Sequence, residues 1–449
     1  MKDKAKAEKD QATSAKAAEI QERLLEFLGP LLITLDAVLD KRLVRTFVHA
    51  LEAIIKFRHG HNGLLLSELG SHILNPSQAP AGTKRLSNLL RSKRWGHEII
   101  ARYLWQGAQQ RVAQLQEAGE EVLLVWDESV LEKAESLELE GLCAVRSSVA
   151  RRLKRIKRGF YTPPTGPIFV PGMQWIGLLV LGMSGKPVVA AMRWWSSRGK
   201  FATDKRPEEE ALLIQSVQCW GSSVLHIWDR GFAGAPWLGV ALSYAVRFVL
   251  RWQKGYKLVD AQGTKRKAWQ ICRGKRSLAH AMIWDARRRR YRQIGIYFTP
   301  VSHPDYPDTP LWLIVSRQGK GHQPWYLLTN QPVHSTDDAC EFILAYARRW
   351  QIEMAWRYTK TELAIESPRL WSWQNRLKLL LMATLAYAFL LSLLPLDSLR
   401  LWLLRNWCHR TGKRCRDAST PLYRLRSALS CLWLAHPPPA FRLPTEIPG

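Results

Sequence analysis

Two short apolar runs, each followed at once by an aspartate, constrain the fold of this 449-residue chain more than any other feature. The first covers residues 122–126 and precedes Asp127, and the second covers residues 224–228 and precedes Asp229. Unbroken apolar runs of this length are typical of strands that are buried on both faces of a sheet. We therefore expect an α/β domain with both aspartates at the rim of its sheet, where sites are commonly built.

The segments around these runs predict the topology of the sheet. Strand-like segments at 175–181 and 187–194 follow the first run, and a helix is expected over 207–220 before the second run. A short helix and a last strand over 245–252 come after it. Because irregular loops join the first three strands, we expect antiparallel pairing among them and parallel pairing afterwards.

The strong positive charge of the chain indicates a polyanionic partner. Lys and Arg number 66 against 38 Asp and Glu, which leaves a formal net charge of +28. Nucleic acid and an anionic membrane surface are the two candidates. The longest mostly apolar run, residues 379–394, is shorter than the roughly 20 residues that span a bilayer, so we interpret it as a buried helix and expect no membrane association.

The termini and the cysteines point to a cytosolic protein. Residues 1–20 alternate Lys with acidic residues and contain no apolar stretch of signal-peptide type. Seven widely spaced cysteines suggest reduced thiols. The cluster of Cys408, His409 and Cys415 is a weak zinc signal, and we interpret these residues as structural.

The chain outside the two runs divides by its residue pattern. Helical spacing dominates 21–115, short strands with polar turns dominate 255–335, and helical patterns return after them. The expected divisions are a solvated charged tail (1–20), a helical DNA-binding domain (21–115), the first part of the α/β core (118–254), a β-rich insertion (255–335), the last core helices (336–395) and a basic C-terminal region (396–449).

Three basic segments are candidates for DNA contact. Residues 63–94 are typical of a helix, a short turn and a second helix, which suits either a DNA-reading helix-turn-helix or a plain bundle with a basic surface. The second helix, expected from about Thr83, carries Lys84, Arg85, Arg91, Lys93 and Arg94. The clusters at 146–158 and 265–292 are nearly free of acids, which favours a track for phosphates over an ordinary solvated surface.

A third carboxylate is needed if Asp127 and Asp229 are to share a metal site, because hard ions such as Mg²⁺ are held by several oxygen ligands. A helix expected over 337–363 offers Glu353. On that helix Tyr346, Arg349, Glu353 and Lys360 fall within a stripe about 60° wide. The stripe is either a metal ligand among phosphate-binding groups or a solvated face with internal salt bridges.

These residues resemble a known family. The spacing Y-x2-R-x3-E-x6-K of the stripe is similar to the signature of one large group of bacterial insertion-sequence DDE transposases. The segments 127–129 with Lys133 and 229–232 resemble the two aspartate motifs of that group, and Trp325 opens a segment, 325–330, similar to the strand that returns from its β insertion. The resemblance covers about 120–395.

The resemblance implies an α/β fold of RNase H-like type: a mixed sheet with helices on both faces, a β-rich insertion between the second and third carboxylates, and a separate helical N-terminal domain. It implies that Asp127, Asp229 and Glu353 are catalytic and hold two Mg²⁺ ions, for which Mn²⁺ can substitute. The residues that it assigns to DNA or phosphate are Tyr346, Arg349, Lys360, Arg230 and Trp325.

Several alternatives stay open at this stage. Glu128 competes with Asp127, and Glu362 and Glu366 compete with Glu353, although only the family pattern separates them. Trp325 either stacks on a flipped base, as in hairpin-forming relatives, or is one of many core tryptophans such as Trp126 and Trp228.

The expected partners are double-stranded DNA, as terminal inverted repeats and as target, and a second copy of the chain, because two DNA ends must be joined. A domesticated nuclease and a basic DNA-binding protein without catalysis are the competing functions. The expected location is the bacterial cytosol, on the nucleoid.

Overall fold

The computed structural model describes residues 2–136, 138–148, 166–285, 290–319, 322–408 and 422–441. Five helices precede the sheet, namely α1 (Lys2–Asp36), α2 (Lys41–Lys56), α3 (Leu66–Ile73), α4 (Ala79–Arg91) and α5 (Glu98–Glu117), with the short helix η1 (Pro76–Gln78) before α4. Within the α/β core lie β1 (Leu123–Glu132), β2 (Cys143–Arg146), β3 (Phe169–Leu181), β4 (Val188–Trp195), α7 (Lys205–Trp220), β5 (Leu225–Trp228), η3 (Arg230–Phe232), α8 (Ala235–Ser243) and β6 (Arg247–Arg251).

The remaining elements complete the sheet and cover it. The β-rich part contains β7 (Lys257–Val259), β8 (Lys265–Lys267), α9 (Ala268–Ile271), β9 (Ala279–Asp285), β10 (Arg290–His303), β11 (Tyr306–Arg317) and β12 (Trp325–Thr329). The last helices are α10 (Thr336–Ala347), α11 (Trp350–Thr361), α12 (Trp373–Ser392), α13 (Asp397–Trp407) and α15 (Leu422–Ala435).

Twelve described strands form one mixed sheet, whose main path runs β2-β3-β1-β5-β6-β12-β11-β10-β7-β8. The pairing expected from the sequence is confirmed: β1, β3 and β4 are antiparallel neighbours, whereas β5 is parallel to both β1 and β6. The predicted β-rich insertion continues this sheet, because β12 pairs antiparallel with β6. The long insertion therefore stays anchored to β6, the neighbour of β5 in the sheet.

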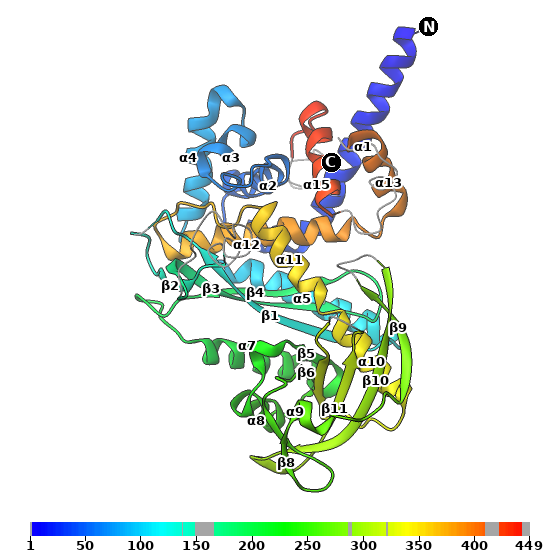
Figure 1. Cartoon of the computed structure of the whole chain (residues 1–449). Helices are drawn as coiled ribbons and strands as arrows, with labels where there is room; N and C mark the ends of the chain where they lie inside the picture. The colour runs from blue at the N-terminus through cyan, green and yellow to red at the C-terminus, as the bar shows by residue number, and fades with distance from the viewer. Residues whose placement is uncertain are drawn as a thin grey trace, which may run out of the picture.

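Helices cover both faces of the sheet (Figure 1), as expected. Leu123 and Val125 of β1 pack into the core that contains α11 and α12, whereas Leu124 and Trp126 pack into the core that contains α7 and α8. In Figure 1 the helices α2–α4, α13 and α15 lie beyond α12 on the first side. Because successive side chains of a strand point to opposite faces, the residues of β1 after Trp126 alternate between these two sides of the sheet.

Helix α12 lies inside the protein. By length and composition it could cross a membrane, but 83% of its most apolar 18-residue window is buried. This agrees with the interpretation of the apolar run as a core helix. Lys378 of α12 is also buried, and its ammonium group donates to the carbonyl oxygens of Leu90 (2.9 Å) and Ser92 (2.7 Å) after α4.

The prediction of a separate charged tail at residues 1–20 is corrected by α1, which begins at Lys2. Most described side chains over 7–16 are exposed, as expected of a charged segment, but Ala17 and Ile20 are buried. The indole of Trp433 on α15 donates to the carbonyl oxygen of Ala17 (3.2 Å). The end of this segment is therefore held in the core by α15. Local composition does not encode this long-range packing.

Candidate carboxylate site

Asp127 and Asp229 occupy matching positions on neighbouring parallel strands. Paired residues of β1 and β5 differ in number by 102, as in Leu123 with Leu225 and Val125 with Ile227. The two aspartates keep the same separation, 229 − 127 = 102, one step past the end of β5. Neighbouring strands lie about 4.8 Å apart, so the two backbones present their carboxylates side by side.

The two aspartates also belong to the same face of the sheet. Val125 and Ile227, two residues before them, both pack toward the core of α11 and α12. The intervening Trp126 and Trp228 are fully buried on the opposite face, where their rings meet at 6.2 Å between centroids. The burial of both tryptophans agrees with their prediction as core residues, and their ring contact anchors the ends of the two strands beneath the carboxylates.

The carboxylate of Asp127 contacts two hydrogen-bond donors and one guanidinium group. Its Oδ2 accepts a hydrogen bond from the indole Nε1 of Trp356 on α11 (3.0 Å) and lies 3.9 Å from a guanidinium nitrogen of Arg349. Its Oδ1 accepts from the backbone N–H of Glu128 (2.9 Å). The side chain is only 15% exposed, so these contacts replace most of its hydration.

The electrostatics of Asp127 show that the three predicted carboxylates influence one another. Burial raises the pKa of Asp127 to about 7, Arg349 opposes this change, and the negative charges of Asp229 and Glu353 raise the pKa further. A carboxylate whose neighbours repel its charge is stabilised when a cation joins the group. This part of the protein therefore favours binding of positive charge.

A glycine-dependent turn fixes Asp229. Its carboxylate accepts a hydrogen bond from the backbone N–H of Gly231 and so caps the short helix η3. A Cβ atom on Gly231 would lie 2.9 Å from Oδ1 of Asp229, which leaves no room for a larger residue without a shift of this carboxylate. Arg230, between them, is exposed and so is placed to meet a ligand that approaches the rim of the sheet.

The helix predicted over 337–363 is in fact two helices, α10 and α11, joined at Arg348 and Arg349. Hydrogen bonds at this joint span three residues: the N–H of Arg349 donates to Tyr346 (3.0 Å) and that of Ile352 to Arg349 (3.1 Å). Such bonds wind the chain more tightly than an α-helix and shift the side chains that follow. The residues of the predicted stripe are therefore divided between α10, which carries Tyr346, and α11, which carries Glu353 and Lys360.

Arg349 joins Glu353 to Asp127. Its guanidinium makes an ion pair with Glu353 one turn along and lies 5.7 Å from the ring centroid of Tyr346. The Arg349 side chain is 11% exposed, and the surrounding acidic groups raise its pKa against the effect of burial. A buried guanidinium therefore stands between two of the predicted metal ligands.

Tyr346 and Trp325 form an aromatic pair beside Arg349. Tyr346 is buried, and burial raises its pKa. The ring of Trp325, at the start of β12, meets Tyr346 edge-on with 5.1 Å between centroids. Trp325 is only partly buried, unlike Trp126 and Trp228, so it combines a packing contact with some exposed surface.

Lys360 lies two helical turns beyond Glu353 on α11. It follows Glu353 by seven residues, or about 10 Å along the helix. Its ammonium group donates to the carbonyl oxygen of Val130 (2.5 Å) and pairs with Glu366 (3.7 Å). In this arrangement Lys360 braces β1 against α11, and a phosphate contact would require it to leave Glu366.

The structure places the competing carboxylates elsewhere. Glu128 belongs to the opposite face of β1, where it pairs with Lys205 of α7. Glu362 pairs with Arg58 at the end of α2 (3.3 Å). Like Glu366, these side chains are directed away from the group formed by the two aspartates and Glu353.

Trp356 and Gly177 are the site residues that sequence reasoning missed. Gly177 of β3 lies opposite Asp127 in the sheet register. A Cβ atom on Gly177 would come within 2.2 Å of the indole ring of Trp356. The missing side chain thus admits the indole that donates to Asp127. A glycine inside an apolar strand, which often marks a close approach, was the available signal.

Three other predicted groups fall partly outside the described residues. The basic cluster at 146–158 lies mostly within 149–165, and residues 286–289 interrupt the cluster at 265–292. In the described part of the second cluster, the residues of β8 are all exposed. Cys408 is buried, whereas His409 and Cys415 lie outside the described residues.

The donor set fits a divalent cation in its chemistry. In the part of the chain that the structure describes, no three His, Cys, Asp or Glu side chains converge closely enough to hold a metal ion. Arg349 contacts both Asp127 and Glu353 and places positive charge between them. The carboxylate oxygens are the ligands that Mg²⁺ prefers, and their mutual repulsion gives a cation a reason to bind.

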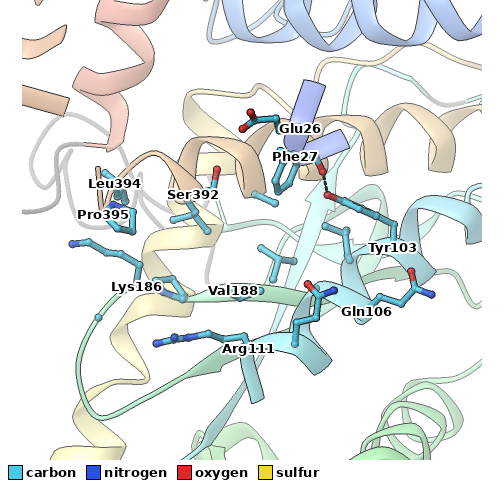
Figure 2. Close-up of a pocket in the computed structure, with 18 of the residues that line it drawn as sticks. Glu26, Phe27, Tyr103, Gln106, Arg111, Lys186, Val188, Ser392, Leu394 and Pro395 are labelled. Carbon is cyan, nitrogen blue, oxygen red and sulfur yellow. Dashed lines mark hydrogen bonds between the residues drawn. The ribbon is translucent and has the colours of Figure 1, made fainter. Parts of the chain in front are cut away.

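A cavity of about 930 Å³ lies elsewhere, between α1, α5, α12 and the turn from β3 to β4 (Figure 2). Tyr103, Arg111, Lys186, Val188 and Ser392 are among the residues around it. None of the carboxylates described above lines it. The cavity is therefore separate from the candidate site.

Comparisons with known proteins leave the family open. No protein-family model and no curated protein matches the sequence. Among solved structures, the chain is similar to the piggyBac transposase in a synaptic complex with hairpin DNA, at 12% sequence identity and a TM-score of 0.41. The similarity covers 98% of this chain and 86% of that chain.

Proposed function

We propose that this protein is a DDE-type DNA transposase, which moves a bacterial insertion sequence by cutting DNA at the ends of the element and joining those ends to a target. One observation carries the proposal. Asp127 and Asp229 lie side by side on one face of an α/β sheet, and the charges of Asp229 and Glu353 both act on Asp127. The three carboxylates follow one another in the order of the transposase motifs that the sequence resembles.

In this proposal Asp127, Asp229 and Glu353 hold two Mg²⁺ ions, and Mn²⁺ can replace them. When bound, such ions would supply the activation of a nucleophile and the neutralisation of charge that phosphodiester cleavage requires. Glu353 would hold such an ion with the carboxylate that here pairs with Arg349. The indole of Trp356 orients Asp127 throughout, because its hydrogen bond uses only one of the two carboxylate oxygens.

The cationic and aromatic residues of the site then act on DNA. Arg349 and the exposed Arg230 neutralise phosphate charge beside the carboxylates, since guanidinium groups match phosphate oxygens in geometry. Tyr346 orients Arg349 through its ring. Lys360 contributes once it leaves Glu366, and the exposed surface of Trp325 stacks on an unpaired base near the cut end.

The partners follow from the chemistry. Two element ends and a target must meet, so we propose a homodimer on double-stranded DNA that carries the terminal inverted repeats. The formal net charge of +28 favours the long polyanion that this reaction requires. The setting that we propose is the nucleoid of a bacterial cytosol.

The test is cleavage and strand transfer by purified protein with Mg²⁺ and DNA that bears the inverted repeats of the element. Asp127→Asn, Asp229→Asn and Glu353→Gln should each abolish cleavage and leave DNA binding largely intact. Glu366→Gln is the matched control, since it removes a nearby carboxylate that pairs with Lys360, and it should retain cleavage.

The outcomes separate the competing functions. Cleavage without strand transfer would identify a nuclease, and metal-independent binding without cleavage would identify a DNA-binding protein. A wild-type cleavage rate in any one of the three variants would remove that residue from the site.

A further inference from the structure

A second cleft, of about 620 Å³, lies between α2 and α4, away from the carboxylates. The two helices lie side by side in the N-terminal part of the protein (Figure 1). The residues that line the cleft are Asp40, Arg42, Leu43, Arg45, Thr46, His49, Arg85 and Asn88. Among the described residues, three guanidinium groups and one carboxylate therefore share this concave surface.

Helical spacing directs these side chains into the cleft. Arg42, Arg45 and His49 are separated by three and four residues, so they form one stripe of α2. The other face of α2 is apolar and buried, with Phe47 and Leu51 in the core. On α4, Arg85 and Asn88 repeat the same spacing and are both exposed. The two polar stripes face each other across the cleft.

The carboxylate of the cleft is already engaged. Asp40 caps α2, and its Oδ1 accepts hydrogen bonds from the backbone N–H groups of Arg42 (3.0 Å) and Leu43 (3.1 Å). Burial lowers the pKa of His49, and Arg85 and Arg45 lower it further, while Glu52 opposes them. Among the described residues that line this cleft, guanidinium groups therefore outnumber carboxylates.

We infer that the cleft between α2 and α4 binds the phosphodiester backbone of duplex DNA, at a site distinct from the carboxylates. Guanidinium groups hold phosphate oxygens by paired hydrogen bonds, and three of them on one concave surface suit consecutive phosphates. The inference rests on the proposed function, because that function makes DNA the polyanion that the chain meets.

This site assigns a different role to the basic helix of the N-terminal domain. Contacts with phosphates position a protein on DNA but do not read its sequence. Arg85, one of the residues first considered for base reading, here acts together with Arg42 and Arg45 of the preceding helix. The sequence pattern of residues 63–94 did not include that helix.

The experiment measures the affinity for duplex DNA of random sequence across a range of salt concentrations, with EDTA present so that no divalent metal engages the carboxylates. The test variant combines Arg42→Gln, Arg45→Gln and Arg85→Gln. The control variant combines Arg23→Gln, Arg102→Gln and Arg405→Gln, which remove the same charge from α1, α5 and α13. Circular dichroism and thermal melting verify that both variants fold.

Each lost phosphate contact should weaken binding about eightfold at 0.1 M salt and reduce the slope of log affinity against log salt by about 0.9. The test variant should therefore lose about 60-fold to 500-fold in affinity for two to three contacts, and its slope should fall by about two to three. The control variant should lose much less, and replacement of the same three residues by lysine should restore part of the affinity.

Three results would overturn the inference. Equal losses in the test and control variants would show a general charge effect. A test variant that binds DNA as the wild type does, but no longer responds to added inorganic phosphate, would assign the cleft to a free anion. If the wild-type protein binds no DNA, both this inference and the proposed function are refuted. If the wild type cleaves DNA and the test variant binds DNA as tightly as the wild type, only the inference is refuted.

Discussion

Replacement of Asp127 by asparagine should stabilise the metal-free protein above neutral pH, although it removes a proposed catalytic ligand. Burial raises the pKa of Asp127 from a usual value of 3.8 to about 7. The ionised side chain is therefore less favourable in the folded protein than in the unfolded chain. Asparagine has nearly the same shape, can still accept the hydrogen bond from Trp356 and carries no charge.

The size and sign of the effect follow from the two pKa values. Between about pH 4 and pH 7 the folded protein retains a proton that the unfolded chain has released, so the contribution of Asp127 to stability falls as pH rises through this range. The full difference corresponds to about 4 kcal/mol, at about 1.4 kcal/mol per pKa unit. The attraction of Arg349, which the variant loses, is already part of this net value.

The assay is thermal or urea denaturation in EDTA at several pH values from 4 to 8.5. Asp127→Asn should match the wild type near pH 4 and melt several degrees higher at pH 8, since about 1 kcal/mol shifts the melting temperature of a domain of 150–250 residues by about 2–4 °C. Added Mg²⁺ should then stabilise the wild type more than the variant.

The matched control is Asp397→Asn, which changes an aspartate that is 75% exposed and should leave stability nearly unaltered at every pH. The reasoning is refuted if Asp127→Asn is no more stable than the wild type at pH 8, or if its advantage is the same at pH 4 and pH 8.

Three further substitutions test the surroundings of the site. Trp356→Phe removes the hydrogen bond to Asp127, so cleavage should fall about tenfold at pH 7 and recover partly at higher pH; a pH–rate profile unchanged in shape and height would contradict this role. Gly177→Ala forces a Cβ atom against the indole of Trp356 and should cost about 1–3 kcal/mol, which denaturation would measure; wild-type stability and activity would show that the indole can move freely. Trp325→Ala should leave a folded protein that nicks the first strand but fails to form or open a DNA hairpin, as strand-resolved gels would show, whereas a melting temperature several degrees lower with all steps slowed alike would identify Trp325 as a packing partner of Tyr346 only.

Local patterns were sufficient to predict the core of the sheet. The two apolar runs became β1 and β5, and the loop types between segments predicted which strands pair antiparallel and which pair parallel. These features are local, because burial of a strand and the length of a connection are both written in consecutive residues. The burial of α12 was predicted on the same basis, from one apolar run.

Long-range contacts decided which residues surround the carboxylates. The choice between Asp127 and Glu128 needed the register of β1 against its neighbours, since adjacent residues of a strand point to opposite faces. The hydrogen bond from Trp356 to Asp127 depends on the gap at Gly177, and these residues are far apart in the chain. No spacing rule within one segment contains that information.

The sequence by itself determined the order of the elements, the two strand-end aspartates and the excess of positive charge, because each depends on residue types within a short stretch or on their totals. Only the tertiary structure divided the helix around Arg349, paired Lys360 with Glu366 and set Arg42 and Arg45 opposite Arg85. Ion pairs and clefts form between segments that folding brings together, so their partners are known only when the whole chain is packed.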